Sequence, residues 1–236
     1  MKVLPPVLVV LGAVASFFSL SSTVPQVLRA FRSRSAQGVS WGSVLISLGT
    51  FVLWCVYSAV VADPVQLVNN TLAFGLLALL AVGLLRADRR RWWTDGSAAL
   101  LAAAAGAVVG IALAAALGPF VLAMVGTVVS AVRMWPQTRL AISRAPMWGL
   151  DPWATTLGWL GWLVWTAYGV GVGDHALTVS SITGFVMQST IMAFRLPPRR
   201  TLHAVAGGRL GPVAARIATP VSGRFPMRAA DFELAA

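Results

Sequence analysis

The stretch VPQVLRAFRS, residues 24–33, returns in altered form 111 positions later as WPQTRLAISR, residues 135–144. The same offset pairs further residues along the chain: Gly38 with Gly149, Trp54 with Trp165, Tyr57 with Tyr168, Asp63 with Asp174 and Phe74 with Phe185. Five matches in one register, without a gap, indicate an internal repeat. The chain is therefore expected to contain two copies of one structural unit.

The composition places both copies in a membrane. The chain is 58% hydrophobic and 11% charged, and its mean hydropathy is +0.79, so a water-soluble fold would expose far too much apolar surface. A spanning helix needs about 20 mainly apolar residues. The sequence offers seven such segments: 4–28, 39–61, 64–85, 97–117, 119–142, 153–173 and 175–194. The prediction is an all-α integral membrane protein with seven transmembrane helices.

The fourth segment, 97–117, has no partner in the repeat. It consists almost entirely of Ala, Leu, Val and Gly, and its Gly106 and Gly110 offer a small-residue face for close helix packing. Three helices per repeat would place the second copy upside down, and one extra crossing restores the orientation of the first. We therefore interpret 97–117 as a linker between two parallel repeats.

The domain organisation follows from this arrangement. The first three-helix repeat covers residues 4–85, the linker helix 97–117 and the second three-helix repeat 119–194. Residues 195–236 lose the apolar pattern and gain Pro, Gly and Arg, which predicts a basic, mostly disordered tail.

Arginine placement predicts the orientation. Arginines follow the first, third, fifth and seventh helices, whereas the other side of a seven-helix arrangement carries only Lys2, Asp63, Asp174 and His175. Short basic loops stay cytoplasmic, so the N-terminus is expected outside and the C-terminus inside, in the plasma membrane. The net charge of +11 is then explained by these loops and by contact with anionic lipid headgroups rather than by a nucleic-acid partner.

The motif VPQVLRAFRSRSAQGVS at residues 24–40, followed by LWCVY at residues 53–57, resembles the PQ-loop (MtN3/saliva-type) superfamily. The layout of three, one and three helices is similar to that of its SWEET sugar transporters, which are related to the shorter SemiSWEETs. The resemblance covers about residues 4–194. It implies a pocket between two bundles that rock against each other, with a bilayer around it and a mono- or disaccharide as the substrate.

Four positions are candidates for that pocket: Trp54, Asn70, Trp165 and Ser181. Trp54 lies nine residues before Asp63 and Asn70 seven after it, so both sit roughly 10–14 Å below the outer surface. A Trp face suits the C–H face of a sugar, and an Asn amide both donates to and accepts from hydroxyls. The resemblance carries binding onto Trp54, Asn70 and Trp165, and Ser181 stands where the family commonly has Asn. For Asn70 a structural bond between helices remains the alternative.

The PQ pairs, Pro25–Gln26 and Pro136–Gln137, fall near the cytoplasmic ends of the first helices of each repeat. Proline inside a helix removes a backbone hydrogen bond and leaves a hinge, and the resemblance implies bending at an intracellular gate. A helix that ends at the interface is the other interpretation. Arg133, one turn before Pro136, either reaches the cytoplasmic surface with its charge or places a cation at that gate, which would favour an anionic substrate.

At the outer surface, each repeat places a Tyr six residues before an Asp: Tyr57 with Asp63, and Tyr168 with Asp174. This pattern is similar to the extracellular gate of SWEET-type carriers. Asp63 followed by Pro64 is equally a good helix start, with Asp as the N-cap. Both interpretations remain open at this point.

The sequence therefore predicts passive (uniport) transport of a small sugar by alternating access. The alternatives are a proton-coupled PQ-loop amino-acid carrier and a non-transporting membrane receptor for cargo peptides. An enzyme is not expected, because no convergent set of titratable groups lies in the core, and no cofactor or metal site is expected. Self-association is left open, since one chain already holds both repeats.

Overall fold

The structure, a computed structural model, describes residues 4–33, 41–87, 92–143, 152–195, 199–224 and 226. Every regular element in these ranges is a helix: α1 Pro6–Ser33, α2 Trp41–Val60, α3 Pro64–Ala87, α4 Trp92–Ile142, α5 Pro152–Val172, α6 His175–Arg195, α7 Arg199–Ala206 and α8 Pro212–Ser222. The predicted all-α membrane fold is confirmed. The paired Gly38 and Gly149 lie outside the described residues.

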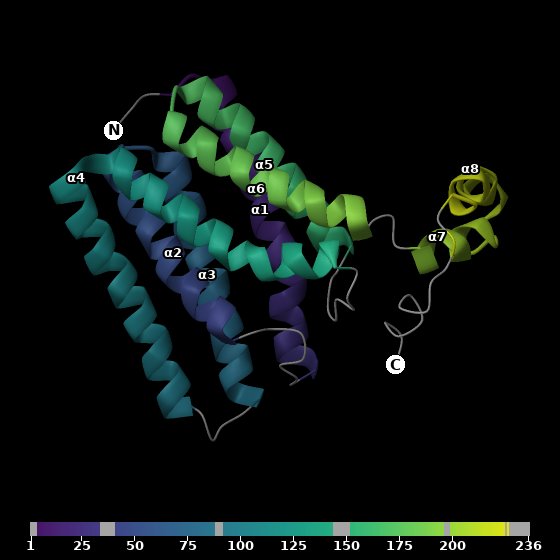
Figure 1. Ribbon diagram of the computed structural model, residues 1–236, viewed down its shortest axis with the longest axis horizontal. Coiled ribbons are helices and arrows are strands. Elements are labelled where there is room, and N and C mark those ends of the chain that lie inside the picture. The colour runs from purple at the N-terminus through teal and green to yellow at the C-terminus, as the bar shows by residue number, and fades with distance from the viewer. Residues whose placement is uncertain are drawn as a thin grey trace.

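Helix α4 consists of two helical segments. It has 51 residues, and Gly118 inside it adopts a non-helical conformation with φ 82° and ψ 170°. A straight helix of this length would measure roughly 77 Å at about 1.5 Å per residue, more than twice a membrane core of about 30 Å. Gly118 accepts the positive φ and Pro119 starts the next helix, so the chain turns back where segments 97–117 and 119–142 were predicted to meet (Figure 1).

The helices form two three-helix bundles. In the first, α3 packs against both α1 and α2, and in the second, α6 packs against both α5 and α4, with Ala176 of α6 in one apolar cluster with Leu122 of α4. The bundles meet along two seams, α1 against α5 and α2 against α4. Each seam pairs the first helix of one bundle with the second helix of the other.

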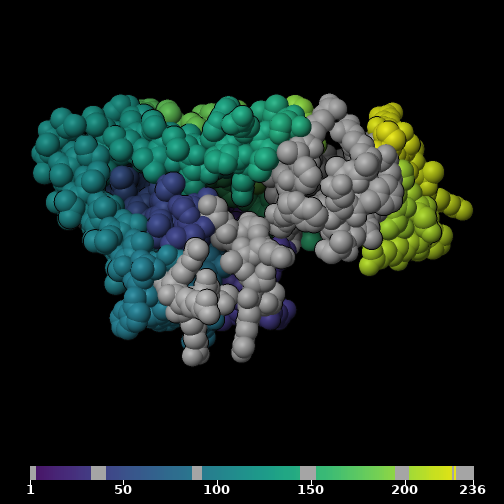
Figure 2. Space-filling model, turned by 60° about the horizontal axis from the view of Figure 1, so that its bottom comes forward, coloured from purple at the N-terminus to yellow at the C-terminus, as the bar shows by residue number. Residues whose placement is uncertain are grey.

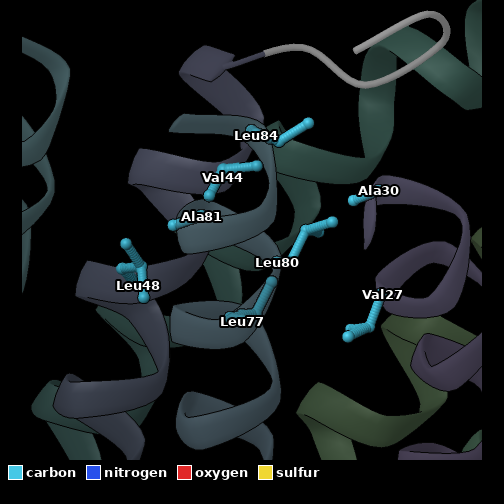
Figure 3. Packing of buried hydrophobic residues seen from close by; sticks show 8 residues of the cluster. All are labelled: Val27, Ala30, Val44, Leu48, Leu77, Leu80, Ala81 and Leu84. Carbon is cyan, nitrogen blue, oxygen red and sulfur yellow. The ribbon is translucent and has the colours of Figure 1, made fainter. Parts of the chain in front are cut away.

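Eight buried side chains form the core of the first bundle: Val27, Ala30, Val44, Leu48, Leu77, Leu80, Ala81 and Leu84. Figure 3 shows Leu80 of α3 between Val27 and Ala30 of α1 on one side and α2 on the other. The second bundle buries Ala141 against Ile191, and these are the positions 111 residues after Ala30 and Leu80. The repeat in the sequence therefore corresponds to equivalent packing positions.

The first half of α4, residues 92–117, packs on α2 through glycines. A Cβ on Gly106 would collide with the backbone of Gly49, and a Cβ on Gly110 would lie 3.3 Å from Val56 Cβ. The opposite face exposes Leu100, Leu101, Val108 and Ile111. Close packing of the predicted linker is confirmed, and in Figure 2 this segment forms the left edge of the molecule.

By length and apolar content, five described helices can cross a membrane: α1, α2, α3, α4 and α6. Helix α5 is formed but is not among them. It carries four tryptophans, Trp153, Trp159, Trp162 and Trp165, a residue type enriched at membrane interfaces. The count of seven crossings therefore stays a prediction.

The tail differs from the predicted disorder, because residues 199–206 and 212–222 form α7 and α8, which pack on each other. Gly211 with φ 90° precedes Pro212 at the start of α8. The prediction weighed the loss of the apolar pattern and the gain of Pro, Gly and Arg, but Gly followed by Pro also begins a helix. Both helices lie apart from the bundles (Figure 1).

The bundles have two opposite ends, which we call the aspartate end and the PQ end. The aspartate end holds residues 61–63, which join α2 to α3, and residues 173–174, which join α5 to α6. The PQ end is the opposite one and carries Pro25–Gln26 and Pro136–Gln137. Helix α1 and the second half of α4 both start at the aspartate end, where Leu8 lies near Tyr168 and Leu122 near Tyr57, so the two bundles are parallel.

The two ends differ in how closely the bundles approach each other. In Figure 1 the bundles meet at the aspartate end, whereas at the PQ end the first bundle points to the bottom of the view and the second to the right. Gln26, Pro136 and Gln137 are exposed there. The molecule is therefore joined at one end and spread at the other.

Candidate functional site

Two reciprocal hydrogen bonds join the bundles at the aspartate end. Tyr57 Oη of the first bundle donates to Asp174 Oδ1 of the second at 2.7 Å. Tyr168 Oη of the second bundle donates to both oxygens of Asp63 in the first, each at 2.9 Å. All four side chains of the sequence-predicted outer gate are thus brought together, and each Tyr bonds to the Asp of the other repeat.

The aspartates also cap the helices that follow them. Asp63 Oδ1 accepts from the backbone N–H groups of Val65 and Gln66, both at 3.0 Å, and Asp174 Oδ1 accepts from Leu177 N–H at 2.9 Å. Capping and contact between the bundles, which the sequence left as alternatives, occur in the same carboxylates. Each cap fixes its carboxylate on its own bundle, within reach of a tyrosine from the other.

The turn before each cap has the same shape in both repeats. Ala62 has φ 57° and Gly173, its partner in the repeat, has φ 70°. A left-handed residue ends α2 or α5 and directs the next residue, the Asp, to the start of the following helix. Equivalent turns therefore give the two aspartates equivalent positions.

Gln66 is a member of this cluster that the sequence analysis missed. Its amide Nε2 donates to Asp63 Oδ2 at 2.8 Å and to Asp174 Oδ2 at 3.2 Å, and the side chain is 1% exposed. One neutral amide thus bridges the two carboxylates. The repeat contained a signal for this role, because Gln66 corresponds to Leu177 in the second repeat. A polar residue at a position where the other repeat has an apolar one indicates a polar contact that only one repeat makes.

The donors in this cluster are all neutral. The donors that the described residues supply to Asp63 and Asp174 are two tyrosine hydroxyls, the Gln66 amide and backbone N–H groups. Hydrogen bonds to a carboxylate are stronger than neutral ones, so the two tyrosines and Gln66 help to hold the bundles together at this end.

The two candidate pocket tryptophans lie one turn from these tyrosines. Trp54 packs edge-to-face on Tyr57 and Trp165 on Tyr168, each with ring centroids 5.3 Å apart. Both indoles are buried, at 8% and 6% exposed. The two tryptophans therefore hold equivalent positions in the two bundles.

Each tryptophan also faces the first helix of the other bundle. Trp165 Nε1 donates to Ser19 Oγ of α1 at 2.9 Å, a contact that sequence reasoning missed. A Cβ on Gly126 of α4 would lie 3.2 Å from Trp54 Cε2. The tryptophans therefore line the two seams between the bundles.

Asn70 makes bonds within the first bundle. Its Nδ2 donates to Ser58 Oγ at 3.0 Å and to the Trp54 carbonyl at 3.4 Å, and its Oδ1 accepts from Asn69 Nδ2 at 3.4 Å. The structural bond between helices that the sequence left as an alternative is present here. It ties Asn70 of α3 to the α2 segment that carries Trp54.

Ser181 of α6, the repeat partner of Asn70, is fully buried, and its Oγ has no hydrogen-bond partner among the described residues. The Oδ1 atom of Asn69 is also buried without a partner in this part of the chain. Buried polar atoms of this kind call for water or a ligand. No hydrogen bond within the described residues links Trp54 or Asn70 to Trp165 or Ser181, so the four positions form two equivalent pairs rather than one bonded cluster.

At the PQ end, both prolines lie inside continuous helices. Helix α1 runs eight residues beyond Pro25 and α4 runs six beyond Pro136. Pro25 is half-buried, while Gln26, Pro136 and Gln137 are exposed. Neither proline marks the end of its helix, so the position is the one that a hinge requires.

Arg133 lies near Pro136 but reaches sideways to α2. Its Nη1 donates to Ser47 Oγ at 3.1 Å, and its guanidinium carbon lies 5.8 Å from the ring centre of Phe51. The side chain therefore crosses a seam instead of following its own helix toward the surface.

The fold and these contacts define a helical membrane protein built from two parallel three-helix bundles, which are joined by reciprocal Tyr–Asp hydrogen bonds at one end. Residues 7–67 match the family model of the PQ loop repeat. Among solved structures, that of a eukaryotic SWEET transporter is similar in fold, with a TM-score of 0.66, 14% sequence identity, and coverage of 79% of this chain and 94% of that chain. A comparison with curated proteins gives no match. The chain thus contains a PQ-loop repeat and has a SWEET-like fold.

Proposed function

We propose that this protein is a passive transporter of a small sugar that works by alternating access. The observation that carries the proposal is the contrast between its two ends. Reciprocal Tyr–Asp bonds hold the bundles together at the aspartate end, while the bundles diverge at the PQ end. A carrier that opens to one side at a time needs this asymmetry in each of its states.

In the proposed transport cycle, the bundles, the linker and the residues at each end have distinct roles. Residues 4–85 and 119–194 form the moving bundles, with 97–117 as the linker, and the aspartate end faces outward. The tyrosines and aspartates are the outer gate, which is closed here. Bending at Pro25 and Pro136 closes the inner side, with Gln26 and Gln137 beside them.

The proposed substrate site lies between the gates. Trp54 and Trp165 offer aromatic faces for the C–H face of a sugar, and the buried Ser181 hydroxyl has a free hydrogen-bonding capacity. Asn70 supplies a further amide when substrate competes with Ser58. Similarity to a eukaryotic SWEET transporter supports this assignment through the fold.

Flux through purified protein in liposomes tests the proposal. Counterflow of labelled glucose is measured at equal pH on both sides for the wild type and for Trp54→Phe, with Trp153→Phe as the matched control because Trp153 is 77% exposed. The wild type should show counterflow, and Trp54→Phe should weaken it roughly 2- to 10-fold, since an aromatic contact is worth about 0.5–1.5 kcal/mol. The control should match the wild type.

Other outcomes would redirect the assignment. Equal flux in Trp54→Phe and the wild type would remove Trp54 from the substrate site. Accumulation of an amino acid driven only by an imposed pH gradient would establish a proton-coupled carrier, and peptide binding without any flux would establish a receptor.

A further inference from the structure

Arg133 is a cation placed between the two bundles. It lies in the second half of α4, and its hydrogen bond to Ser47 Oγ crosses the seam to α2. Ser47 is only 5% exposed, and its own hydroxyl donates to the Ser43 carbonyl at 2.6 Å. The Ser47 oxygen is therefore oriented as an acceptor for the guanidinium.

The charge of Arg133 has no acidic partner in the described part of the chain. Its contacts there are the Ser47 hydroxyl and the Phe51 ring, and its Nε is buried without an acceptor. Of the described acids, Asp63 and Asp174 are held at the aspartate end by tyrosines, and Asp95 lies in the first turn of α4. Arginines inside membrane segments usually pair with an acid or line a substrate path.

The position of Arg133 follows the candidate pocket along the same seam. Ser47 precedes Trp54 by seven residues on α2, and Arg133 follows Gly126, which faces Trp54, by seven on α4. Seven residues are two turns, about 10 Å. A molecule stacked on Trp54 would meet Arg133 next on its way to the PQ end.

The other seam shows that packing does not demand an arginine here. The repeat partners of Arg133 and Ser47 are Ser22 and Gly158, and a Cβ on Gly158 would lie 3.9 Å from Ser22 Cβ. Two small uncharged residues thus close the equivalent contact. The single cation on one seam favours a ligand with one negative charge.

We propose that Arg133, supported by Ser47, binds the carboxylate of the transported molecule, which makes the substrate class a singly charged sugar acid. The unpaired Nε and a terminal nitrogen of the guanidinium form an edge that accepts a carboxylate in two parallel hydrogen bonds. Trp54 and Trp165 then contact the hydroxylated carbon chain. The inference rests on the proposed transport function and narrows its substrate.

The test compares charged and neutral substrates in liposomes of neutral lipid. Counterflow of labelled gluconate, glucuronate and glucose is measured for the wild type, Arg133→Gln and Arg133→Lys, with Arg139→Gln as the matched control, an exposed arginine in the last turn of the same helix. At neutral pH the sugar acids are anions. We expect Arg133→Gln to reduce sugar-acid flux at least tenfold while retaining glucose flux. Arg133→Lys should recover part of the sugar-acid flux, and Arg139→Gln should match the wild type for all three substrates.

Two further measurements test charge recognition, and the second of them does not require transport. Passive uptake of a singly charged anion carries current, so an inside-positive potential set with valinomycin should accelerate acid uptake and leave glucose uptake unchanged. Thermal stabilisation of the detergent-solubilised protein by gluconate should disappear in Arg133→Gln, and this readout needs no flux. Size-exclusion profiles of all variants establish that they are folded.

Each contrary result has a distinct meaning. Glucose transport without acid transport, or equal acid flux in Arg133→Gln and the wild type, would overturn the carboxylate site and leave the proposed function standing. Gluconate stabilisation that depends on Arg133, without flux of any sugar, would support the site and overturn transport. Stabilisation that follows added anionic lipid instead of gluconate would assign the anion to a headgroup and overturn the inference. Asp151 lies outside the described residues, and an Asp151→Asn variant with the same losses as Arg133→Gln would identify an acid of the chain itself as the partner of Arg133 and would also overturn the inference.

Discussion

Removing the tyrosine hydroxyls should open the aspartate end. Tyr57→Phe deletes the 2.7 Å bond to Asp174, and Tyr168→Phe deletes the bonds to both oxygens of Asp63. The rings and their contacts with Trp54 and Trp165 remain, so the change is confined to the polar link between the bundles.

The magnitude follows from the type of bond. A hydrogen bond to a charged group contributes about 1.5–3 kcal/mol, so each substitution should shift the equilibrium between closed and open aspartate ends roughly 10- to 150-fold. Water that enters the opened aspartate end hydrogen-bonds to the carboxylate that has lost its tyrosine. This stabilises the open state relative to the closed one and shifts the equilibrium in the same direction. The double variant should populate the open state most.

Distances between spin labels measure this equilibrium. Labels at Val60 and Val170, which are 49% and 66% exposed near the aspartate end, are introduced in a Cys55→Ala background because Cys55 is a free thiol. Each Tyr→Phe variant should increase the population at longer distances. Thr183→Val is the matched control, since it deletes a hydroxyl that bonds only to its own helix, at the Val179 carbonyl.

A double-mutant cycle decides whether the bonds cross between repeats. Tyr57→Phe combined with Asp174→Ala should show a coupling of about 1.5–3 kcal/mol, because the lost helix cap is common to both Asp174→Ala variants and cancels. Tyr57→Phe combined with Asp63→Ala has no direct bond to lose. A larger coupling of Tyr57 to Asp63 than to Asp174, or unchanged label distances in both tyrosine variants, would refute the reasoning.

Two further predictions concern stability of the purified protein in detergent. Gly106→Leu should lower the unfolding temperature, at a cost of about 1–3 kcal/mol in the free energy of unfolding from overpacking against Gly49. The control Gly75→Leu should change the unfolding temperature little, because a Cβ there has no neighbour within 4 Å. Equal effects of the two substitutions would contradict the close contact of α4 with α2. Ala62→Gly should raise the unfolding temperature by relieving up to about 1 kcal/mol at φ 57°, and Gly173→Ala should lower it; a stabilising Gly173→Ala would contradict the left-handed turn.

The helices could be predicted because their signals are local. Apolar runs of spanning length gave the approximate bounds of the helices in the two bundles, and the predicted boundary between segments 97–117 and 119–142 falls at Gly118, where α4 turns. The repeat then placed Tyr57 and Asp63 at the same level as their partners. None of these inferences needed knowledge of which side chains meet.

Contacts across the seams could not be predicted in the same way. Spacing along one helix gives depth and face, but the partner of a side chain depends on how two bundles dock. Ser19 is an ordinary small residue in the sequence until Trp165 bonds to it, and Ser47 until Arg133 does. Gln66 was accessible in principle, because its mismatch with Leu177 stands beside two matched aspartates.

The dual use of the two aspartates explains how the aspartate end could open without loss of helix structure. The bonds from Val65, Gln66 and Leu177 N–H groups keep each carboxylate at the start of α3 or α6, within its own bundle. Among the hydrogen bonds that the described residues make to these two carboxylates, only the tyrosine bonds and one of the two Gln66 bonds cross to the other bundle. In the proposed rocking motion, the crossing bonds break while the caps persist, and the carboxylates remain in position to accept the same tyrosines when the bundles close again.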